Sequence, residues 1–131
     1  MNRLNEIEAR ANAATEGPWE HEPPPGPGED PMRPICVYPK EDGGTLAYVQ
    51  PLEADAEFIA HARTDVPDMA AALRAVLEVH QDGGESQGYL DDGHYGDIPH
   101  CCTECGSLGE YGVPWPCATV TAIRQHLGDD Q

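Results

Sequence analysis

Four of the chain's five cysteines lie in one short stretch, HCCTECGSLGEYGVPWPC, which spans residues 100–117. Cys102 and Cys105 form a Cys-x-x-Cys pair followed by Gly106, and Cys117 comes 12 residues after Cys105. A short turn lets the two thiolates of such a pair converge on one metal ion, and a glycine relieves the strain of that turn. These three cysteines are therefore predicted to be three ligands of a zinc ion.

The fourth ligand must come from another part of the chain, because a structural zinc site takes four protein ligands. His80 is the first candidate, since it ends the strongest amphipathic helical pattern of the sequence on its apolar side. His100 and Cys101 are the alternatives, and His94 follows them. The predicted zinc ligands are thus His80, Cys102, Cys105 and Cys117, with His100 or Cys101 as the alternative fourth ligand.

Other chemistry fits these cysteines less well. A thioredoxin-like redox pair should follow a strand and open a helix, whereas this pair is expected between loops. A catalytic zinc would keep one open position beside a general base, for which Glu104 and Glu110 are near in sequence. The His-x-Glu and Pro-Cys-x-x-Cys motifs of zinc deaminases are absent. A nucleophilic cysteine and a set of unliganded cysteines are further alternatives, and Cys36 is predicted to be a lone buried thiol.

The helices and strands that must position the ligands can be predicted from the spacing of apolar residues and from the positions of prolines and turn residues. Apolar spacing favours a helix over residues 3–15, and six prolines make residues 22–34 a loop. Two strands, 35–38 and 45–50, flank a turn and predict a β-hairpin. A helix is expected over 53–63, with Phe58, Ile59 and Ala62 facing inward. A second helix should run to His80, with Pro67 in its first turn.

The rest of the chain is predicted as a Gly- and Asp-rich loop over 81–101, then a zinc knuckle and a C-terminal helix over 102–128. Val120, Ile123 and Leu127 mark the inner face of that helix, and Gly128 is expected to end it. Hydrophobic residues make up 39% of the chain, with one phenylalanine, so the core is thin and a metal ion is expected to supplement it. We therefore predict an α+β fold: one small zinc-stabilised domain over 1–131, with a β-hairpin and three to four helices.

The charge of the chain bears on which partners it could bind. There are 24 acidic and 7 basic residues, which give a formal net charge of −17. This balance argues against binding to nucleic-acid phosphates or to an anionic membrane surface. It leaves a solubilising surface or an acidic face that occupies a basic partner. The sequence has no apolar run of membrane-spanning length and no signal-peptide pattern at its N-terminus, so a reducing cytoplasm is expected, where clustered cysteines favour metal binding over disulfides.

Three stretches carry a resemblance: ATEGPWE, DAEFIAHARTDVPDMAAALRAVLEVH, and CTEC with the later WPCATVTAI. Together they resemble a family of short, uncharacterised proteins of actinobacteria and their phages, and the first half is similar to the ead-type early-region proteins of phages. The likeness covers about 80 of the 131 residues. It implies a shared set of His80, Cys102, Cys105 and Cys117, with Trp115-Pro116 as the wedge that places Cys117. Ala118 stands where many members of the family have proline.

The resemblance and the predicted zinc site together lead to a functional expectation. The chain is expected to be a non-enzymatic phage or prophage accessory protein with a structural zinc ion, acting by binding a host or phage protein. One alternative is an acidic decoy that inhibits a host defence or DNA-processing protein, and this alternative predicts salt-sensitive binding. A small zinc-dependent hydrolase is the other alternative. Assembly with further copies of the chain is compatible with each of these functions.

Overall fold

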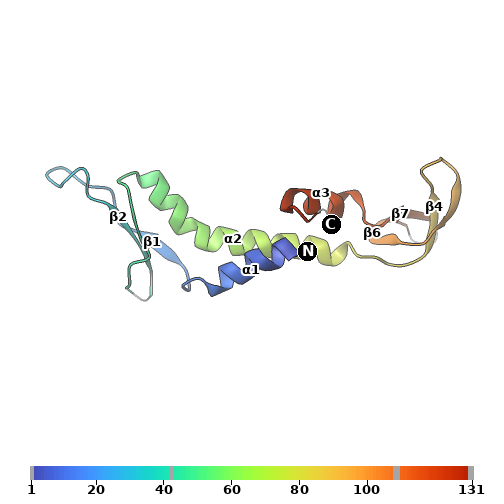
Figure 1. Ribbon diagram of the computed structural model, residues 1–131, viewed down its shortest axis with the longest axis horizontal. Coiled ribbons are helices and arrows are strands. Elements are labelled where there is room, and N and C mark those ends of the chain that lie inside the picture. Colours follow the sequence, from blue (N-terminus) through green and yellow to red (C-terminus); the bar gives the residue numbers. More distant parts are fainter. Residues whose placement is uncertain (1, 42, 108–109, 130–131) are drawn as a thin grey trace. The chain divides into compact units, whose positions relative to one another are not determined.

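The computed structural model describes residues 2–41, 43–107 and 110–129. Within these residues, three helices and three small antiparallel sheets follow one another along the chain, as Figure 1 shows. The predicted α+β class, with a β-hairpin and three helices, is confirmed. None of the described helices combines the length and the apolar character that crossing a membrane requires.

Contacts divide the chain into two compact units. Residues 6–70 form the first, called the N-terminal unit below, and residues 1–5 and 71–131 form the second, called the cysteine unit. The prediction that residues 1–131 make one domain stays a prediction.

A three-stranded antiparallel sheet is the centre of the N-terminal unit. Its strands are β1 (Trp19–His21), β2 (Ile35–Pro39) and β3 (Ala47–Val49), in the order β1-β2-β3. The predicted hairpin is confirmed by the pairing of β2 with β3. Strand β1 was not predicted, because three residues are too few to show an alternating pattern. Ile35 and Val37 on β2 are fully buried and lie in one apolar cluster with Ala56 and Ala60.

Two helices contribute residues to both units, α1 (Asn2–Ala13) and α2 (Glu53–Val79). The prediction of two helices, one ending at residue 63 and another starting near Pro67, is wrong: α2 runs through without a break (Figure 1). Pro67 lacks the N–H of one helical hydrogen bond, but Ala60 and Ala70, on either side of it in α2, are both buried. Burial of residues along α2 thus outweighs the hydrogen bond that is lost at Pro67.

The inward face of α2 also differs from the prediction. Phe58 is 76% exposed, whereas Ala56 and Ala60 are buried against the sheet. Residues 56 and 60 share one helix face, and residue 58 lies about 200° away from residue 56 around the helix axis. The small side chains let the helix approach the sheet closely, and the phenylalanine is consequently directed to the outside. Ile59 is half-buried against the same cluster, as predicted.

The cysteine unit contains two antiparallel hairpins and one helix. Strands β4 (Ser86–Tyr89) and β5 (Tyr95–Ile98) pair with each other, as do β6 (Cys101–Ser107) and β7 (Tyr111–Pro114). The prediction of a loop over 81–101 is therefore wrong. Backbone pairing stabilises a segment that has one buried large side chain, Ile98, so no hydrophobic pattern marks it. Helix α3 (Ala118–Leu127) ends at Gly128 in the left-handed region, as predicted.

Gly106, directly after the Cys-x-x-Cys pair, provides a test of this hairpin. Its φ is +78°, and a Cβ atom there would meet the carbonyl oxygen of Tyr111 on β7. Gly93 has φ +82° but no atom within 4 Å of the corresponding position. We expect Gly106→Ala to lower the free energy of unfolding by about 1–3 kcal/mol more than Gly93→Ala, because only the former adds steric overlap to backbone strain. Guanidinium unfolding curves of the two variants measure this difference, and equal losses would contradict it.

Candidate metal centre

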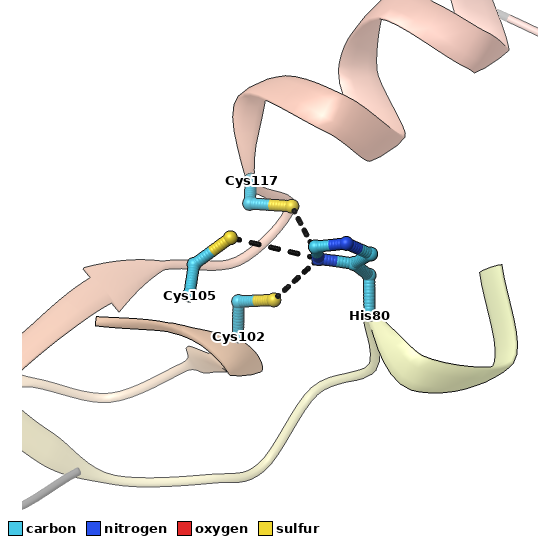
Figure 2. A group of neighbouring side chains, drawn as sticks. All are labelled: His80, Cys102, Cys105 and Cys117. Atoms are coloured by element: carbon cyan, nitrogen blue, oxygen red, sulfur yellow. Dashed lines mark hydrogen bonds between the residues drawn. The ribbon is translucent and has the colours of Figure 1, made fainter. Parts of the chain in front are cut away.

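Four side chains from three elements converge in the cysteine unit. His80 follows the last residue of α2, Cys102 and Cys105 lie on β6, and Cys117 directly precedes α3. Each offers one ligand atom, and these atoms all lie within 4.8 Å of one another. Figure 2 shows the three sulfur atoms grouped around one edge of the imidazole ring. The four residues therefore lie close enough to hold one metal ion.

The distances from the imidazole of His80 to the three thiols are short and nearly equal. The Nδ1 atom of His80 lies 3.4 Å from Sγ of Cys102, 3.5 Å from Sγ of Cys105 and 3.6 Å from Sγ of Cys117. A tetrahedral zinc ion with bonds of about 2.3 Å to sulfur and about 2.0 Å to nitrogen would separate these atoms by about 3.5 Å. The three nitrogen–sulfur separations therefore fit a tetrahedral ion at the centre of the four atoms.

An irregularity in β6 explains how Cys102 and Cys105 meet. In a regular strand successive side chains alternate between the two faces, so residues three apart point in opposite directions. The pairing of β6 with β7 shifts register between Cys101 and Gly106. The shift rotates the strand locally, as a bulge does, and brings both thiols to one side. The same alternation directs Cys101 away from its neighbour Cys102.

Cys117 occupies the N-cap position of α3. Its backbone is extended, with φ −72° and ψ 169°, and its side chain makes no capping hydrogen bond of ordinary geometry. Burial works to raise the pKa of this thiol, but N–H groups at the start of α3, led by that of Val120, together with the two neighbouring thiols, lower the pKa below its usual value. The helix start therefore favours a thiolate at Cys117.

The pKa of Cys105 is shifted in the opposite direction to that of Cys117. Burial, and then the adjacent thiols of Cys102 and Cys117, raise the pKa of Cys105 from 9.0 to about 11. Thiolates that converge repel one another, so the crowded cluster favours a protonated Cys105. A divalent cation at the centre would reverse this effect, because it attracts all three thiolates and displaces their protons.

The alternative ligands lie outside the cluster. His100 is exposed, and its Nδ1 lies 2.7 Å from Oδ2 of Asp82. Cys101 is fully buried, and its Sγ donates to the carbonyl oxygen of Ile98 at 3.8 Å. His94 is exposed and lies beside Asp92. None of the three belongs to the one group of at least three His, Cys, Asp or Glu side chains that could hold a metal among the described residues.

Apolar side chains surround the cluster. Cys102, Cys117 and Val120 are buried together, with Leu77, Val113 and Trp115 packed against them. The guanidinium of Arg124 lies 5.7 Å from the centre of the Trp115 ring, at the distance of a cation–π contact. Cys36 lies in the N-terminal unit on β2 and is buried, as predicted for a lone thiol. Two of the three residues buried around the cluster are thus the predicted ligands themselves.

Sequence reasoning missed Thr103, which holds the backbone on both sides of His80. Its Oγ1 donates to the carbonyl oxygen of Val79 at 2.6 Å and accepts from the N–H of Gln81 at 3.0 Å. Its own N–H donates to the carbonyl oxygen of Gln81 at 2.9 Å. The hydroxyl thereby satisfies a carbonyl at the end of α2 that has no helical partner. Its position between two predicted ligands was the available signal.

We expect Thr103→Val, which removes the hydroxyl but keeps the shape, to weaken metal binding about 10- to 100-fold, the range found for residues that orient metal ligands. Thr103→Ser keeps the hydroxyl and should bind nearly as tightly as the unchanged protein. Competition with a chromophoric chelator measures the affinities, and the absorption bands of a bound Co²⁺ ion report the ligand geometry. Equal affinities of the valine and serine variants would show that the hydroxyl does not position His80.

Comparisons of the chain with protein-family models, with curated proteins and with solved structures find no match.

Proposed function

We propose that this chain is a non-enzymatic zinc-binding accessory protein, in which the zinc ion holds the cysteine unit together. The convergence of four ligand atoms within 4.8 Å of one another carries the proposal. Three thiols and one imidazole suit zinc, because sulfur ligands select soft ions and their arrangement around one centre suits a tetrahedral ion. Carboxylate and carbonyl oxygens, which calcium and magnesium prefer, are not among the four donors.

A structural role is favoured over a catalytic one by the number of protein ligands. Four protein donors complete a tetrahedral shell and leave no position for a water molecule or a substrate. No carboxylate is among the four donors, so the donor set differs from the two-histidine, one-glutamate set of zinc peptidases. The surrounding core is also thin, so that metal binding would contribute directly to folding.

The proposed zinc ion can be tested by its number and its coordination. Elemental analysis of protein purified without added chelator is expected to find about one zinc ion per chain. X-ray absorption should show three sulfur neighbours at about 2.3 Å and one nitrogen neighbour at about 2.0 Å. A first shell with an additional oxygen neighbour would favour the hydrolase alternative, and protein without metal would rule out the proposal.

The accessory role rests on binding to a protein partner, and three exposed tyrosines supply a candidate surface. Tyr89, Tyr95 and Tyr111 are 59%, 50% and 53% exposed. The ring centre of Tyr89 lies 5.5 Å from that of Tyr95 and 6.0 Å from that of Tyr111, in edge-to-face contacts. Clustered tyrosines with free faces are typical of interface centres, because they contribute large contact areas with little loss of entropy. The resemblance to actinobacterial and phage proteins adds the phage context to this proposal.

The partner can be sought in lysate of an actinobacterial host by affinity capture and mass spectrometry. A partner that uses the tyrosine surface should be lost with Tyr89→Ala and retained with Phe58→Ala, which removes another exposed ring elsewhere in the chain. Capture that persists at high salt would support an apolar interface. Capture that is lost with rising salt would favour the acidic-decoy alternative instead.

A further inference from the structure

A pocket in the N-terminal unit, separate from the proposed zinc site, is lined by α1 and by residues of two of the three stretches that carry the resemblance, ATEGPWE and DAEFIAHARTDVPDMAAALRAVLEVH. It has a volume of about 480 Å³ and lies between α1, Trp19 and α2. Its walls are apolar, with Ile7, Ala11, Trp19 and Val66 among the residues that line it. The volume falls in the range of small-molecule sites, about 300–1,000 Å³, and the apolar lining is typical of them.

The charged groups of the pocket are both cations. Arg10 and Arg63 are the only charged residues that line it, in a chain with 24 acidic and 7 basic residues. Among the described residues, the side chain of Arg10 has no hydrogen bond or ion pair, and Arg63 donates its Nε to one backbone carbonyl. The terminal guanidinium nitrogens are therefore available to an anion. Two cations as the only charged residues of a pocket in so acidic a chain indicate that the ligand is an anion.

The backbone of ATEGPWE builds one wall of this pocket. The carbonyl oxygen of Thr15 accepts from Nε1 of Trp19 at 3.1 Å and from Nε of Arg63 at 2.8 Å, so one acceptor fixes both side chains. Gly17 passes over the stem of Arg63, because a Cβ atom there would lie 2.7 Å from Cγ of that arginine. These contacts hold the aromatic wall and one cation in place before any ligand binds, which limits the entropy lost on binding.

We propose that this pocket binds a small amphipathic carboxylate, with its apolar tail against Trp19 and Ile7 and its carboxylate at Arg10 and Arg63. The apolar walls remove the tail from water, and the two guanidinium groups donate charge-assisted hydrogen bonds to the head. The net charge of −17 repels anions in general, so selective binding of a carboxylate requires these two cations. The site is independent of the proposed zinc ion.

Octanoate is the probe, with 1-octanol and octylammonium as the neutral and cationic probes of the same length. The chain has two tryptophans, so two indole N–H signals appear in a nitrogen–proton NMR spectrum. Octanoate is expected to shift the signal of Trp19 saturably, to leave that of Trp115 unchanged, and to bind at least about five-fold more tightly than 1-octanol. Hexanoate, shorter by two methylenes, should bind about 16-fold more weakly, at about four-fold per methylene.

Variants distinguish the apolar part of the pocket, which would hold the tail, from the two arginines, which would hold the carboxylate. Arg10→Met is expected to weaken octanoate about five-fold and to leave 1-octanol unchanged, since Arg10 is exposed, its side chain has no hydrogen bond or ion pair to lose among the described residues, and methionine keeps an apolar stem in the lining. Ala11→Phe should fill the pocket and abolish binding, whereas Ala9→Phe, on the same helix but outside the lining, should not. Thermal melting verifies that each variant is folded. No saturable shift of Trp19, equal or tighter binding of 1-octanol or octylammonium, or an unchanged octanoate affinity of Arg10→Met would each overturn the proposal.

Discussion

Removal of the proposed zinc ion with a chelator is expected to unfold the cysteine unit while the core of the N-terminal unit stays folded. The buried residues around the cluster are Cys102, Cys117 and Val120, and two of these are predicted ligands. Without the ion, the three thiols lose the interaction that offsets their crowding and burial. Binding free energies of structural zinc are about 10–16 kcal/mol in small zinc-binding peptides, comparable to the whole stability of a typical domain.

The N-terminal unit should respond differently because its core has no metal ligand. Ile35, Val37, Ala56 and Ala60 form that core from a sheet and a helix, and Cys36, the cysteine beside them, lies in a strand. Hydrogen exchange followed by mass spectrometry resolves the two units. After chelation we expect fast exchange over 101–107 and 110–127 and continued protection over 35–39, and added zinc should restore the protection of the former residues. Exchange that is unchanged over 101–107 and 110–127 would contradict a structural role of the ion.

The second large effect is expected from two adjacent cysteines that the structure directs to different surroundings. Cys102→Ser should weaken metal binding by more than about 100-fold, beyond the range for residues that only orient ligands, because a ligand itself is lost. Cys101→Ser should retain the metal. Its hydroxyl would be buried near the carbonyl oxygen of Ile98, and we expect a loss of about 1–3 kcal/mol in stability.

The paired design makes each variant the control of the other, since both replace a fully buried cysteine of β6 with serine. Chelator competition gives the metal affinity, and denaturant unfolding of the metal-loaded protein gives the stability. Loss of the metal from both variants to the same extent would mean that the alternation along β6 does not separate the roles of Cys101 and Cys102. Retention of the metal by Cys102→Ser would exclude Cys102 as a ligand.

The candidate site was accessible to sequence reasoning because its signals are local and chemical. The spacing of Cys102, Cys105 and Cys117 specifies three thiols within one segment, and a helical period places His80 on the apolar side of its helix. The structure brings the atoms of all four together. That they bind a metal ion, and that the ion is zinc, stays a prediction for the experiments above.

Errors in the predicted elements arose where packing outweighs local preference. Pro67 favours a helix start, yet Ala60 and Ala70 are buried on either side of it and α2 continues. The segment 86–98 has the composition of a loop, yet its backbone pairs as a hairpin. Gly88 on β4 lies so close to the backbone of Gly112 on β7 that a Cβ atom there would overlap it. No pattern in the sequence predicts such a close approach between two strands.

By itself, then, the sequence determined the α+β class, the hairpin of β2 and β3, the end of α3 at Gly128, and which residues could supply metal ligands. Each of these depends on interactions between residues close together in the chain or on the chemistry of single side chains. Only the tertiary structure brought His80, rather than His100 or Cys101, to the three thiols, aligned Thr103 with the backbone around His80, and formed a pocket between α1 and α2. These features depend on contacts between residues distant in sequence, whose geometry is set by packing and strand register rather than by local pattern.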